Sequence, residues 1–312
     1  KLLVYASHFA EDFEDARGFG WSVGERSFDW SRLIANKDQE IRRLNQVYAR
    51  LLDQAGVTRI EGRARILDPH TVAVGDRRYT ARYLLVATGG WPCLPAIPGA
   101  EHGITSNEAF HLKELPRHIA IVGGGYIAVE FAGIFHGLGA KVTLLYRGAL
   151  FLRGFDDDVR RHLAEEMQKK GIELRFERNV TALERRGDAL HATLTDGDSL
   201  HVDQILFATG RVPLTQDLGL EDAGITLGNK GEIPVDRLSR SAVPSIYAIG
   251  DVTDRINLTP VALAEAEALA RTLFAGTPTV PDHMNVASAV FSQPPVASVG
   301  LSEEHARARF GA

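Results

Sequence analysis

The chain has 312 residues, carries a net charge of −5 and is 45% hydrophobic. Such a weakly acidic chain predicts no nucleic-acid-binding surface, and no apolar run approaches the roughly 18 residues of a membrane span. The length suits about two domains. The sequence from Lys1 lacks the basic, apolar and small-residue regions of a signal peptide, so we expect a segment inside a helix there.

Cysteine and histidine usage narrows the chemistry. Cys93 is the only cysteine, which excludes an internal disulfide and disfavours a thiolate metal site. The eleven histidines show no HExxH spacing, so we expect no metal. A single cysteine fits a reducing compartment, and we expect a cytoplasmic protein.

The first part of the chain predicts a long helix followed by short strands. Apolar side chains recur at helical spacing over residues 31–55, and Gly56 follows as a stop signal. Short apolar or alternating runs then predict four β segments, at residues 57–60, 64–67, 71–74 and 83–87.

The middle of the chain predicts a βαβ unit. An apolar run at residues 119–122 ends in three glycines, a helical pattern covers 127–138, and a second apolar run follows at 141–147. Another helix is predicted at 156–170, with acidic residues in its first turn and lysines in its last.

Two parts of the chain resemble each other. Residues 82–89 and 203–210 both consist of an apolar run that ends in Ala-Thr-Gly, and each follows a polar, turn-rich β segment, at 75–79 and 196–200. One such pair could arise by chance, whereas two matching contexts predict two nucleotide-binding domains of one design. The first of these has no glycine fingerprint of its own within the chain.

Gly123-x-Gly125-x-x-Ala128 has the form of a dinucleotide-binding fingerprint. The first glycine permits a tight turn, the second lets a pyrophosphate approach the backbone, and the small third residue lets helix and strand pack closely. The motif follows a predicted strand and opens a predicted helix. This context favours nucleotide binding over the alternative, a simple glycine-rich turn.

Two arginines after the second strand of this unit indicate which nucleotide binds. An NAD site usually has an acid about 20 residues after the glycines, whereas this chain has Arg147 there, with Arg153 following. Guanidinium groups suit a 2′-phosphate through charge-assisted hydrogen bonds. The residues therefore favour NADPH, the alternative being a pair of solvated surface arginines.

A strand-like run at residues 245–249 ends in Gly250 and Asp251. The glycine allows a cofactor to approach closely, and the aspartate can accept hydrogen bonds from a polyol chain; the alternative is a strand followed by a turn. An alanine-rich helix is predicted at 261–274. It suits close packing against another helix or a flat ring, and equally suits a plain core helix.

Taken in order, these motifs resemble the glutathione reductase group of pyridine nucleotide–disulfide oxidoreductases over essentially the whole chain. The resemblance is strongest at residues 123–130, 208–213, 247–251 and 290–295. It implies an α/β fold with two Rossmann-like FAD- and NAD(P)-binding domains, one inserted in the other, and the start of an α+β dimerisation domain. It also implies NADPH-dependent reduction of oxidised glutathione through FAD and a redox-active cysteine pair upstream of Lys1. The resemblance further implies a homodimer with no nucleic-acid or membrane partner.

The same resemblance implies roles for individual residues. Tyr126 would cover the flavin until nicotinamide displaces it, Glu130 would pair with a lysine of the cysteine helix, and Tyr48 would contact the glutathione disulfide. Arg147 and Arg153 would bind the 2′-phosphate of NADPH. The remaining cofactor-binding positions are Ala64, Thr88, Gly89, Gly123, Gly124, Gly125, Ile127, Gly210, Asp251 and Thr259.

The resemblance also divides the chain into domains. An FAD-binding domain would comprise residues 1–90 and 214–282, an NADPH-binding domain 91–213, and a dimerisation domain would begin at 283–312. Cys93 would lie at a hinge and is not a catalytic candidate. The FAD fingerprint, the cysteine pair and the catalytic His–Glu pair of the family do not occur in the chain, so we expect this segment alone to be inactive.

The substrate leaves alternatives open. Glu267 stands where several glutathione reductases have a substrate-binding arginine, which leaves trypanothione reductase open. Mercuric reductase and dihydrolipoamide dehydrogenase are the other sister enzymes, and Arg147 and Arg153 argue against the NAD-linked dehydrogenase. The alternative from another class is a non-catalytic nucleotide-binding module.

Overall fold

The computed structural model describes residues 1–311, which form two compact units. Unit 1 contains Lys1–Val47, Pro92–Gly210 and the residues from Ala287 onward, and unit 2 contains Tyr48–Trp91 and Arg211–Val286. The assignment of FAD and NADPH to particular ranges of the chain stays a prediction.

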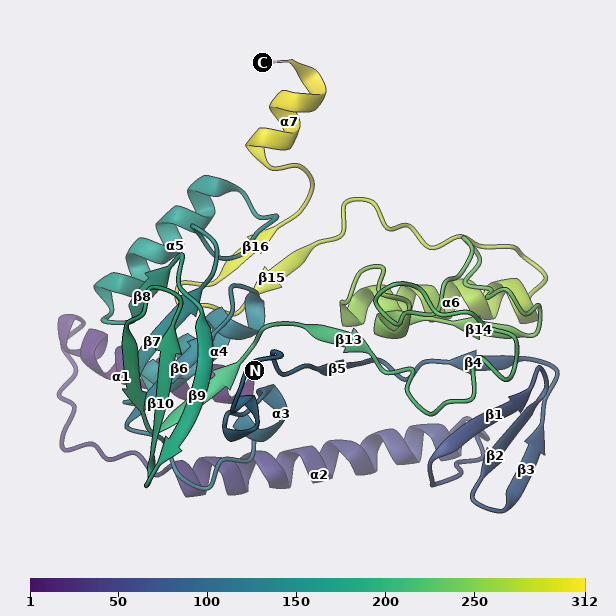
Figure 1. Cartoon of the computed structure of the whole chain (residues 1–312), viewed down its shortest axis with the longest axis horizontal. Helices are drawn as coiled ribbons and strands as arrows, with labels where there is room; N and C mark the ends of the chain where they lie inside the picture. The colour runs from purple at the N-terminus through teal and green to yellow at the C-terminus, as the bar shows by residue number, and fades with distance from the viewer. Residues whose placement is uncertain (312) are drawn as a thin grey trace. The chain divides into compact units, whose positions relative to one another are not determined.

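Unit 1 is built around a four-stranded parallel sheet (Figure 1). In spatial order the strands are β12 (Gln204–Phe207), β6 (His118–Val122), β7 (Lys141–Tyr146) and β8 (Glu173–Phe176). Helix α4 (Tyr126–Gly137) connects β6 to β7, and α5 (Asp157–Lys169) connects β7 to β8. The predicted βαβ unit and the helix after it are therefore confirmed.

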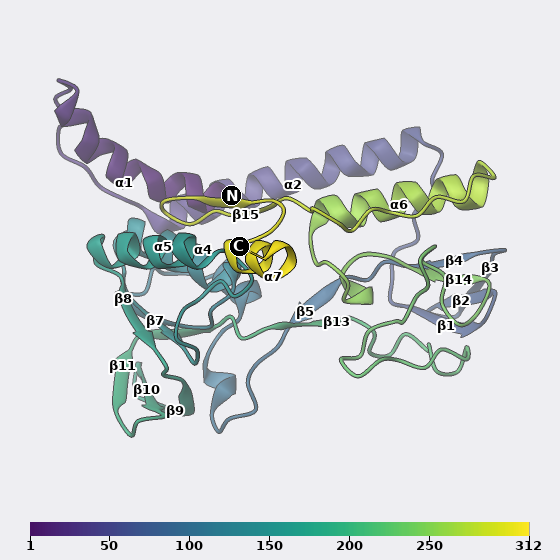
Figure 2. The same ribbon diagram turned by 90° about the horizontal axis from the view of Figure 1, so that it is seen from above.

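Side chains along β6 alternate between two apolar clusters. Ile119 and Ile121 belong to a cluster with residues of α1 and α4, whereas Ala120 and Val122 belong to a cluster with a second, antiparallel sheet. Successive side chains of a strand point to opposite faces, so an uninterrupted apolar run suits a sheet that is covered on both faces. Figure 2 shows α4 and α5 on one side of β7 and β8 and the antiparallel strands on the other. These strands are β9 (Val180–Arg186), β10 (Ala189–Leu194) and β11 (Ser199–Val202).

Helix α1 and the part of helix α2 that ends at Val47 complete the helical side of unit 1. Helix α1 (Leu2–Gly18) packs on α4, where a Cβ on Gly137 would lie 2.6 Å from the carbonyl oxygen of Ser7, so glycine permits the close approach. Helix α2 (Trp30–Gln54) confirms the helix predicted at 31–55. The indole N–H of Trp30 donates to the carbonyl of Leu112 at 2.8 Å. The shorter elements of this unit are η1 (Ala100–His102), α3 (Ser106–Ala109), β15 (Ser288–Val290), β16 (Val296–Ser298) and α7 (Glu303–Phe310).

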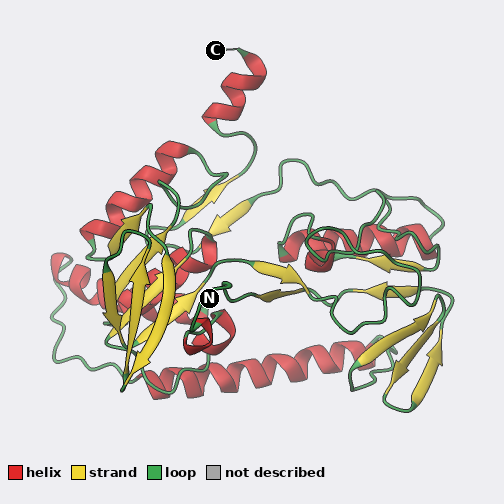
Figure 3. Cartoon of the chain, in the orientation of Figure 1, coloured by secondary structure: helices red, strands yellow, loops and turns green. Residues whose placement is uncertain are grey.

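Unit 2 contains a parallel pair of strands beside a helix (Figure 3). Along the second strand of this pair, Ile246 and Ala248 lie in one apolar cluster, whereas Tyr247 joins Leu269 of the helix in another. The pair is β4 (Leu84–Val86) and β14 (Ile246–Ala248), and the helix is α6 (Thr259–Phe274). The remaining elements are β1 (Ala64–Asp68), β2 (Thr71–Val74), β3 (Arg77–Thr80), β5 (Gly90–Pro92), β13 (Arg211–Pro213) and η2 (Gly250–Thr253).

The predicted internal repeat corresponds to a repeated order of elements. In unit 2 the antiparallel strands β1, β2 and β3 precede β4, and in unit 1 the antiparallel strands β9, β10 and β11 precede β12. In both units the strand that follows joins a parallel pairing. The two resembling sequence segments therefore end the same arrangement twice, as expected for two Rossmann-like domains.

The strand predicted at residues 57–60 is wrong. This segment forms no strand, and Val57 and Ile60 are exposed. The backbone N–H of Val57 donates to the carbonyl of Leu52 at 3.0 Å, and Gly56 has a φ of +72°. The first residues after α2 therefore terminate the helix, which uses the backbone donor that a strand would need.

Candidate functional site

The glycine turn after β6 has room for a ligand at one position only. A Cβ on Gly123 would overlap the carbonyl oxygen of Ala208, and a Cβ on Gly124 would overlap the ring of Tyr146. A Cβ on Gly125 would meet nothing within 4 Å. The first two glycines thus serve close packing, and the third leaves open space beside its backbone, as a pyrophosphate requires.

The same turn begins helix α4. Gly125 is the N-cap and makes no side-chain cap bond, and the first turn of α4 contains no acidic residue. The first N–H groups of a helix lack partners within the helix and carry a partial positive charge. Ala128 is fully buried, which allows α4 to lie close to the sheet. This helix end therefore suits phosphate groups.

The two predicted phosphate-binding arginines lie in the segment between β7 and α5, which we call the arginine loop (residues 147–156). Arg147 and Arg153 are both exposed, and in the described part of the chain neither forms an ion pair. Two guanidinium groups whose charge is not neutralised by a carboxylate suit a dianionic phosphate. The arrangement fits NADPH, and the end of β7, at Tyr146 and Arg147, offers no acid to a free ribose hydroxyl.

A backbone hydrogen bond joins the arginine loop to the glycine turn. The N–H of Leu152 donates to the carbonyl of Gly124 at 2.6 Å. Leu152 has a φ of +53°, although it is not a glycine, and its side chain is buried. The residue that contacts the glycine turn, Leu152, directly precedes Arg153 in the chain, so the backbone of Arg153 starts beside this turn.

Two further predicted residues of the nucleotide site lie at the same edge of the sheet. Ile127 is half-buried in the first turn of α4, and Gly210 follows the end of β12, the parallel neighbour of β6. The carbonyl of Gly210 accepts a hydrogen bond from the N–H of Cys93 at 3.2 Å. The structure thus gathers the predicted NADPH-side residues around the carboxyl ends of β6, β7 and β12.

Glu130 lies one turn after Tyr126 on α4. Its carboxylate accepts a hydrogen bond from the backbone N–H of Phe291 at 3.0 Å, and the Lys1 ammonium lies 4.6 Å from the centre of the Phe291 ring. Burial raises the pKa of Glu130, opposed by the Phe291 N–H and the charge of Lys1. Tyr126 is 42% exposed at the start of the helix.

Unit 2 contains a second candidate site at the ends of its parallel strands. Gly89 and Gly90 follow β4, Asp251 follows β14, and a Cβ on Gly90 would lie 3.4 Å from the Cβ of Asp251. Thr88 donates through its hydroxyl to the carbonyl of Leu214 at 2.7 Å. Carboxyl ends of parallel strands are where α/β sheets bind ligands, and this edge suits the close approach of a second nucleotide.

A buried carboxylate holds the second site together. Glu265 of α6 is 1% exposed and accepts hydrogen bonds from the backbone N–H of Gly250 at 2.7 Å and from His283 at 2.8 Å. It also forms an ion pair with Arg255 at 2.9 Å. A buried charge needs such partners to offset the loss of its hydration. Glu265 therefore ties the turn before Asp251 to the helix.

The sequence profile described as "Pyridine nucleotide-disulphide oxidoreductase" matches residues 1–266. The chain belongs to this family. FAD and NADPH are the cofactors of the family's glutathione reductases. Membership is consistent with two candidate nucleotide sites of similar construction in one chain.

Curated relatives of the chain include several disulfide reductases. The glutathione reductase of Burkholderia cepacia is 52% identical over 99% of the chain, which spans 69% of that protein. The chloroplastic/mitochondrial glutathione reductase of Pisum sativum is 50% identical over the whole chain, which spans 57% of that protein. The trypanothione reductase of Leishmania donovani is 41% identical over 98% of the chain and 66% of its own length.

A solved structure of the same class has the same fold. The HOCl-induced flavoprotein disulfide reductase RclA from Escherichia coli is 29% identical, with a TM-score of 0.88 over the whole chain and 70% of its own. This similarity confirms the prediction of a Rossmann-like flavoprotein fold.

The remaining predicted site residues of this family member are more scattered. Thr259 is exposed at the start of α6, close in the chain to Ala262, which lies 3.4 Å from a Cβ built on Gly250. Ala64 begins β1 in the separate antiparallel sheet. Tyr48 is 64% exposed on α2. The structure thus brings Thr259 toward the second site and leaves Ala64 and Tyr48 on other elements.

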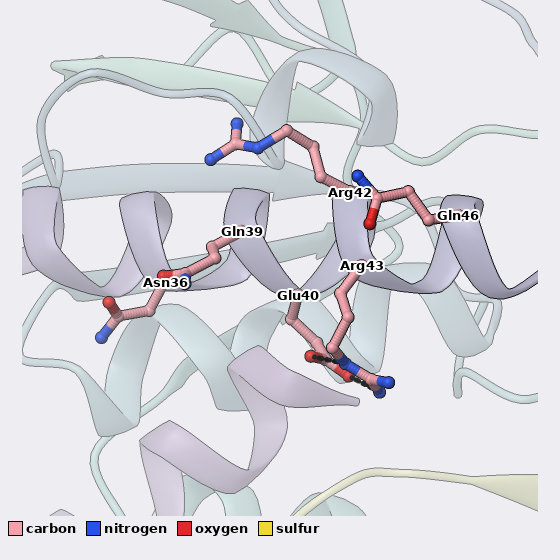
Figure 4. A pocket seen from close by; sticks show the side chains of 6 residues that line it. All are labelled: Asn36, Gln39, Glu40, Arg42, Arg43 and Gln46. Carbon is pink, nitrogen blue, oxygen red and sulfur yellow. Dashed lines mark hydrogen bonds and ion pairs between the residues drawn. The ribbon is translucent and has the colours of Figure 1, made fainter.

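A polar hollow of about 470 Å³ lies along α2 and contains none of the predicted residues (Figure 4). Within it, Arg43 and Glu40 form a two-point ion pair at 2.7 and 2.8 Å. The side chains that line it are Asn36, Gln39, Glu40, Arg42, Arg43 and Gln46. None of these residues lies in a glycine turn or at the end of a parallel strand, where the predicted nucleotide-binding residues lie.

Two negative findings apply to residues 1–311. No group of three or more His, Cys, Asp or Glu side chains is arranged to hold a metal ion. No helix in this range is long and apolar enough to cross a membrane.

Sequence patterns did not single out two residues that the structure shows to hold the candidate sites together, Glu265 and Arg160. Glu265 shares the buried face of α6 with Val261, Ala268 and Leu269, so its helical spacing could have indicated a buried acid. Arg160, which contacts the arginine loop, has no such signal, because an arginine in the second turn of an amphipathic helix usually indicates a solvated face.

Proposed function

We propose that the full-length protein is an NADPH-dependent FAD-containing disulfide reductase that acts on oxidised glutathione. The observation that carries the proposal is the joining of the open glycine turn to a loop with two unpaired arginines, Arg147 and Arg153. The relatives with glutathione reductase names, at 46–52% identity, support the substrate assignment.

In this proposal each unit holds one nucleotide. Gly123, Gly124, Gly125, Ile127, Gly210 and the two arginines hold NADPH, and Ala64, Thr88, Gly89, Asp251 and Thr259 hold FAD. When bound, these groups supply hydride transfer and relay of electrons to a disulfide, which no side chain of this chain provides. The protein positions the nucleotides and limits access of water. A Cβ on Gly89 would meet nothing within 4 Å, and this open space supports close approach at the FAD side.

In the same proposal Tyr126 is the cover of the flavin, and Glu130 is the partner of a lysine of the cysteine helix. Tyr126 directly follows the glycine turn and is partly exposed, as a movable cover requires. The full-length Tyr126→Ala protein should show stronger quenching of flavin fluorescence by iodide in the absence of NADPH, because the cover is missing. Quenching equal to that of the wild type would contradict the role as a cover.

The substrate assignment is tested at Glu267 and Tyr48. Glu267 is 66% exposed and pairs with Arg271 at 2.7 Å, so its charge is compensated. Trypanothione, a cationic disulfide, is the second candidate substrate, because a carboxylate at this position suits it better than anionic glutathione. Glu267→Arg should lower the KM for glutathione disulfide at low salt if the position lies at the substrate. Tyr48→Phe is the corresponding test of the tyrosine.

The direct test of the function uses the full-length protein with bound FAD. NADPH oxidation should depend on glutathione disulfide, with a kcat/KM at least about tenfold above that for trypanothione disulfide or lipoamide. A protein that binds NADPH but reduces no disulfide would favour the non-catalytic module instead. Residues 1–312 alone should show no turnover, because the chain contains no cysteine pair.

We further propose a cytoplasmic homodimer. Helix α1 exposes Tyr5, Phe9 and Phe13 at intervals of four residues, and Phe19 and Trp21 after it are 85% and 72% exposed. Large exposed aromatic surfaces are typical of interfaces, and the second copy expected from the family is the proposed occupant. Sedimentation of the full-length protein should give a dimer, and Phe9→Glu should shift it toward monomer. A single cysteine supports the reducing location, which cell fractionation would test.

A further inference from the structure

One side chain outside the nucleotide site holds the arginine loop. Arg160, in α5, donates from Nε to the carbonyl of Phe151 at 2.7 Å and from Nη2 to the carbonyl of Leu150 at 2.6 Å. Its third nitrogen, Nη1, pairs with Asp157. The side chain of Arg160 is only 15% exposed, so water competes little for these hydrogen bonds.

The carbonyls that Arg160 binds directly precede the strained part of the loop. Leu152 has a φ of +53°. Residues other than glycine adopt this backbone conformation only at a steric cost. Such a conformation persists when surrounding contacts determine it. Here the contacts are the fork of Arg160 on one side and the Leu152–Gly124 hydrogen bond on the other. Arg153 leaves the backbone immediately after this point.

We propose that Arg160 is the positioning residue of the 2′-phosphate site. By bridging two successive carbonyls, it fixes the backbone that carries Arg153 relative to the glycine turn, without touching the nucleotide. The inference rests on the proposed NADPH function and adds a residue to it. It assigns the nucleotide preference partly to the conformation of the loop and not to the two exposed arginines alone.

The conservative change to lysine separates geometry from charge. A guanidinium is planar and presents donors in a fixed fork, whereas an ammonium is a point charge at the end of a flexible chain. Lysine in place of Arg160 keeps the positive charge beside Asp157 but cannot span the carbonyls of Leu150 and Phe151 in the same way. If Arg160 acted through its charge, lysine would suffice.

The next residue in the chain provides a matched control. Arg161 is 60% exposed and pairs with Asp158 at 3.2 Å and Asp157 at 3.9 Å. Both of these partners belong to α5 itself, so Arg161 shares the helix, the charge and one acidic partner with Arg160. Its replacement should leave the arginine loop unchanged.

The experiment compares full-length wild type, Arg160→Lys, Arg160→Gln and Arg161→Lys. Calorimetry measures binding of adenosine 2′,5′-bisphosphate and of 5′-AMP, which lacks the 2′-phosphate. Arg160→Lys should weaken binding of the bisphosphate about tenfold, within the range of remote positioning effects, and leave 5′-AMP binding within about twofold. The KM for NADPH should rise in parallel while kcat is unchanged. Arg161→Lys should match the wild type in every measurement.

Three outcomes would overturn the inference. Wild-type affinity of Arg160→Lys for both probes would show that the fork is not needed. An equal loss for both probes would show a general structural role in unit 1, and melting temperatures of both Arg160 variants would reveal it. A wild-type protein that does not prefer the bisphosphate would refute the NADPH proposal itself, and the inference with it.

Discussion

The two units both end a parallel strand in a glycine-containing turn beside a helix, but they fix that turn by different means. In unit 1 the turn at Gly123–Gly125 is fixed by close packing and by a backbone hydrogen bond to the arginine loop. In unit 2 the turn at Gly250 is fixed by a buried carboxylate, Glu265, which gathers three donors.

This difference predicts that mutations in unit 2 mainly change stability and that mutations in unit 1 mainly change ligand binding. A buried charge cannot lose its partners without a large cost, so unit 2 should respond to mutation mainly in its stability. The recognition groups of unit 1 are exposed on a loop, so they should respond mainly in binding. The predictions below exploit this contrast.

The largest expected effect is at Glu265. Glu265→Gln removes the charge that compensates Arg255 and should lower the free energy of unfolding by about 3–5 kcal/mol. Glu267→Gln, two residues later and 66% exposed, is the matched control and should change it by less than about 0.5 kcal/mol. Urea denaturation of the full-length proteins measures both. Similar stability of the two variants would mean that Glu265 is not a structural centre.

Smaller effects are expected in the glycine turn, on stability at one glycine and on NADPH binding at the next. Gly124→Ala places a Cβ against the Tyr146 ring and should destabilise unit 1 by about 1–3 kcal/mol. Gly125 has a φ of −90° and open space around it, so Gly125→Ala should cost no more than about 1 kcal/mol. It should nevertheless weaken NADPH binding, because the added methyl group occupies the space proposed for the pyrophosphate. Thermal melting measures the first effect and NADPH titration the second. An unchanged affinity of Gly125→Ala for NADPH would show that the pyrophosphate does not bind beside Gly125.

The smallest expected effect is a pH dependence at Asp156. The backbone N–H groups of Glu303 and Asp158 hold the pKa of Asp156 below its ordinary value. A lowered pKa in the folded state contributes stability above the unfolded-state pKa of about 3.9, and this stability is lost as the pH falls through the folded-state pKa. The melting temperature of Asp156→Asn should therefore lie slightly below wild type at pH 7, and the gap should close at acidic pH. A gap independent of pH would exclude the ionised carboxylate as the cause.

Elements with strong local patterns could be predicted from the sequence. The strand–glycine–helix–strand order around Gly123 was correct because its apolar run, turn and helix signals agree locally. The segment at 57–60 was wrong because its apolar residues follow a helix end, where capping takes the backbone donors.

The supports of the site were less predictable. Arg160 binds carbonyls nine and ten residues earlier in the chain, and only the tertiary path of the loop brings them together. The backbone strain at Leu152 has no side-chain signal either. Sequence patterns therefore indicated the groups proposed to touch the nucleotide and missed those that position them.

The central claim is that Arg147 and Arg153 select NADPH. Each charge-assisted hydrogen bond contributes about 1.5–3 kcal/mol; two exposed contacts, reduced by screening, should together give roughly 2–4 kcal/mol. The most direct test is the ratio of kcat/KM for NADPH to that for NADH, measured in the full-length enzyme and in Arg147→Ala/Arg153→Ala. The wild-type ratio should be about 30 to 700, should fall as salt is raised, and should approach one in the double variant. An equal loss of kcat/KM with both nucleotides would contradict the claim and make the arginines structural.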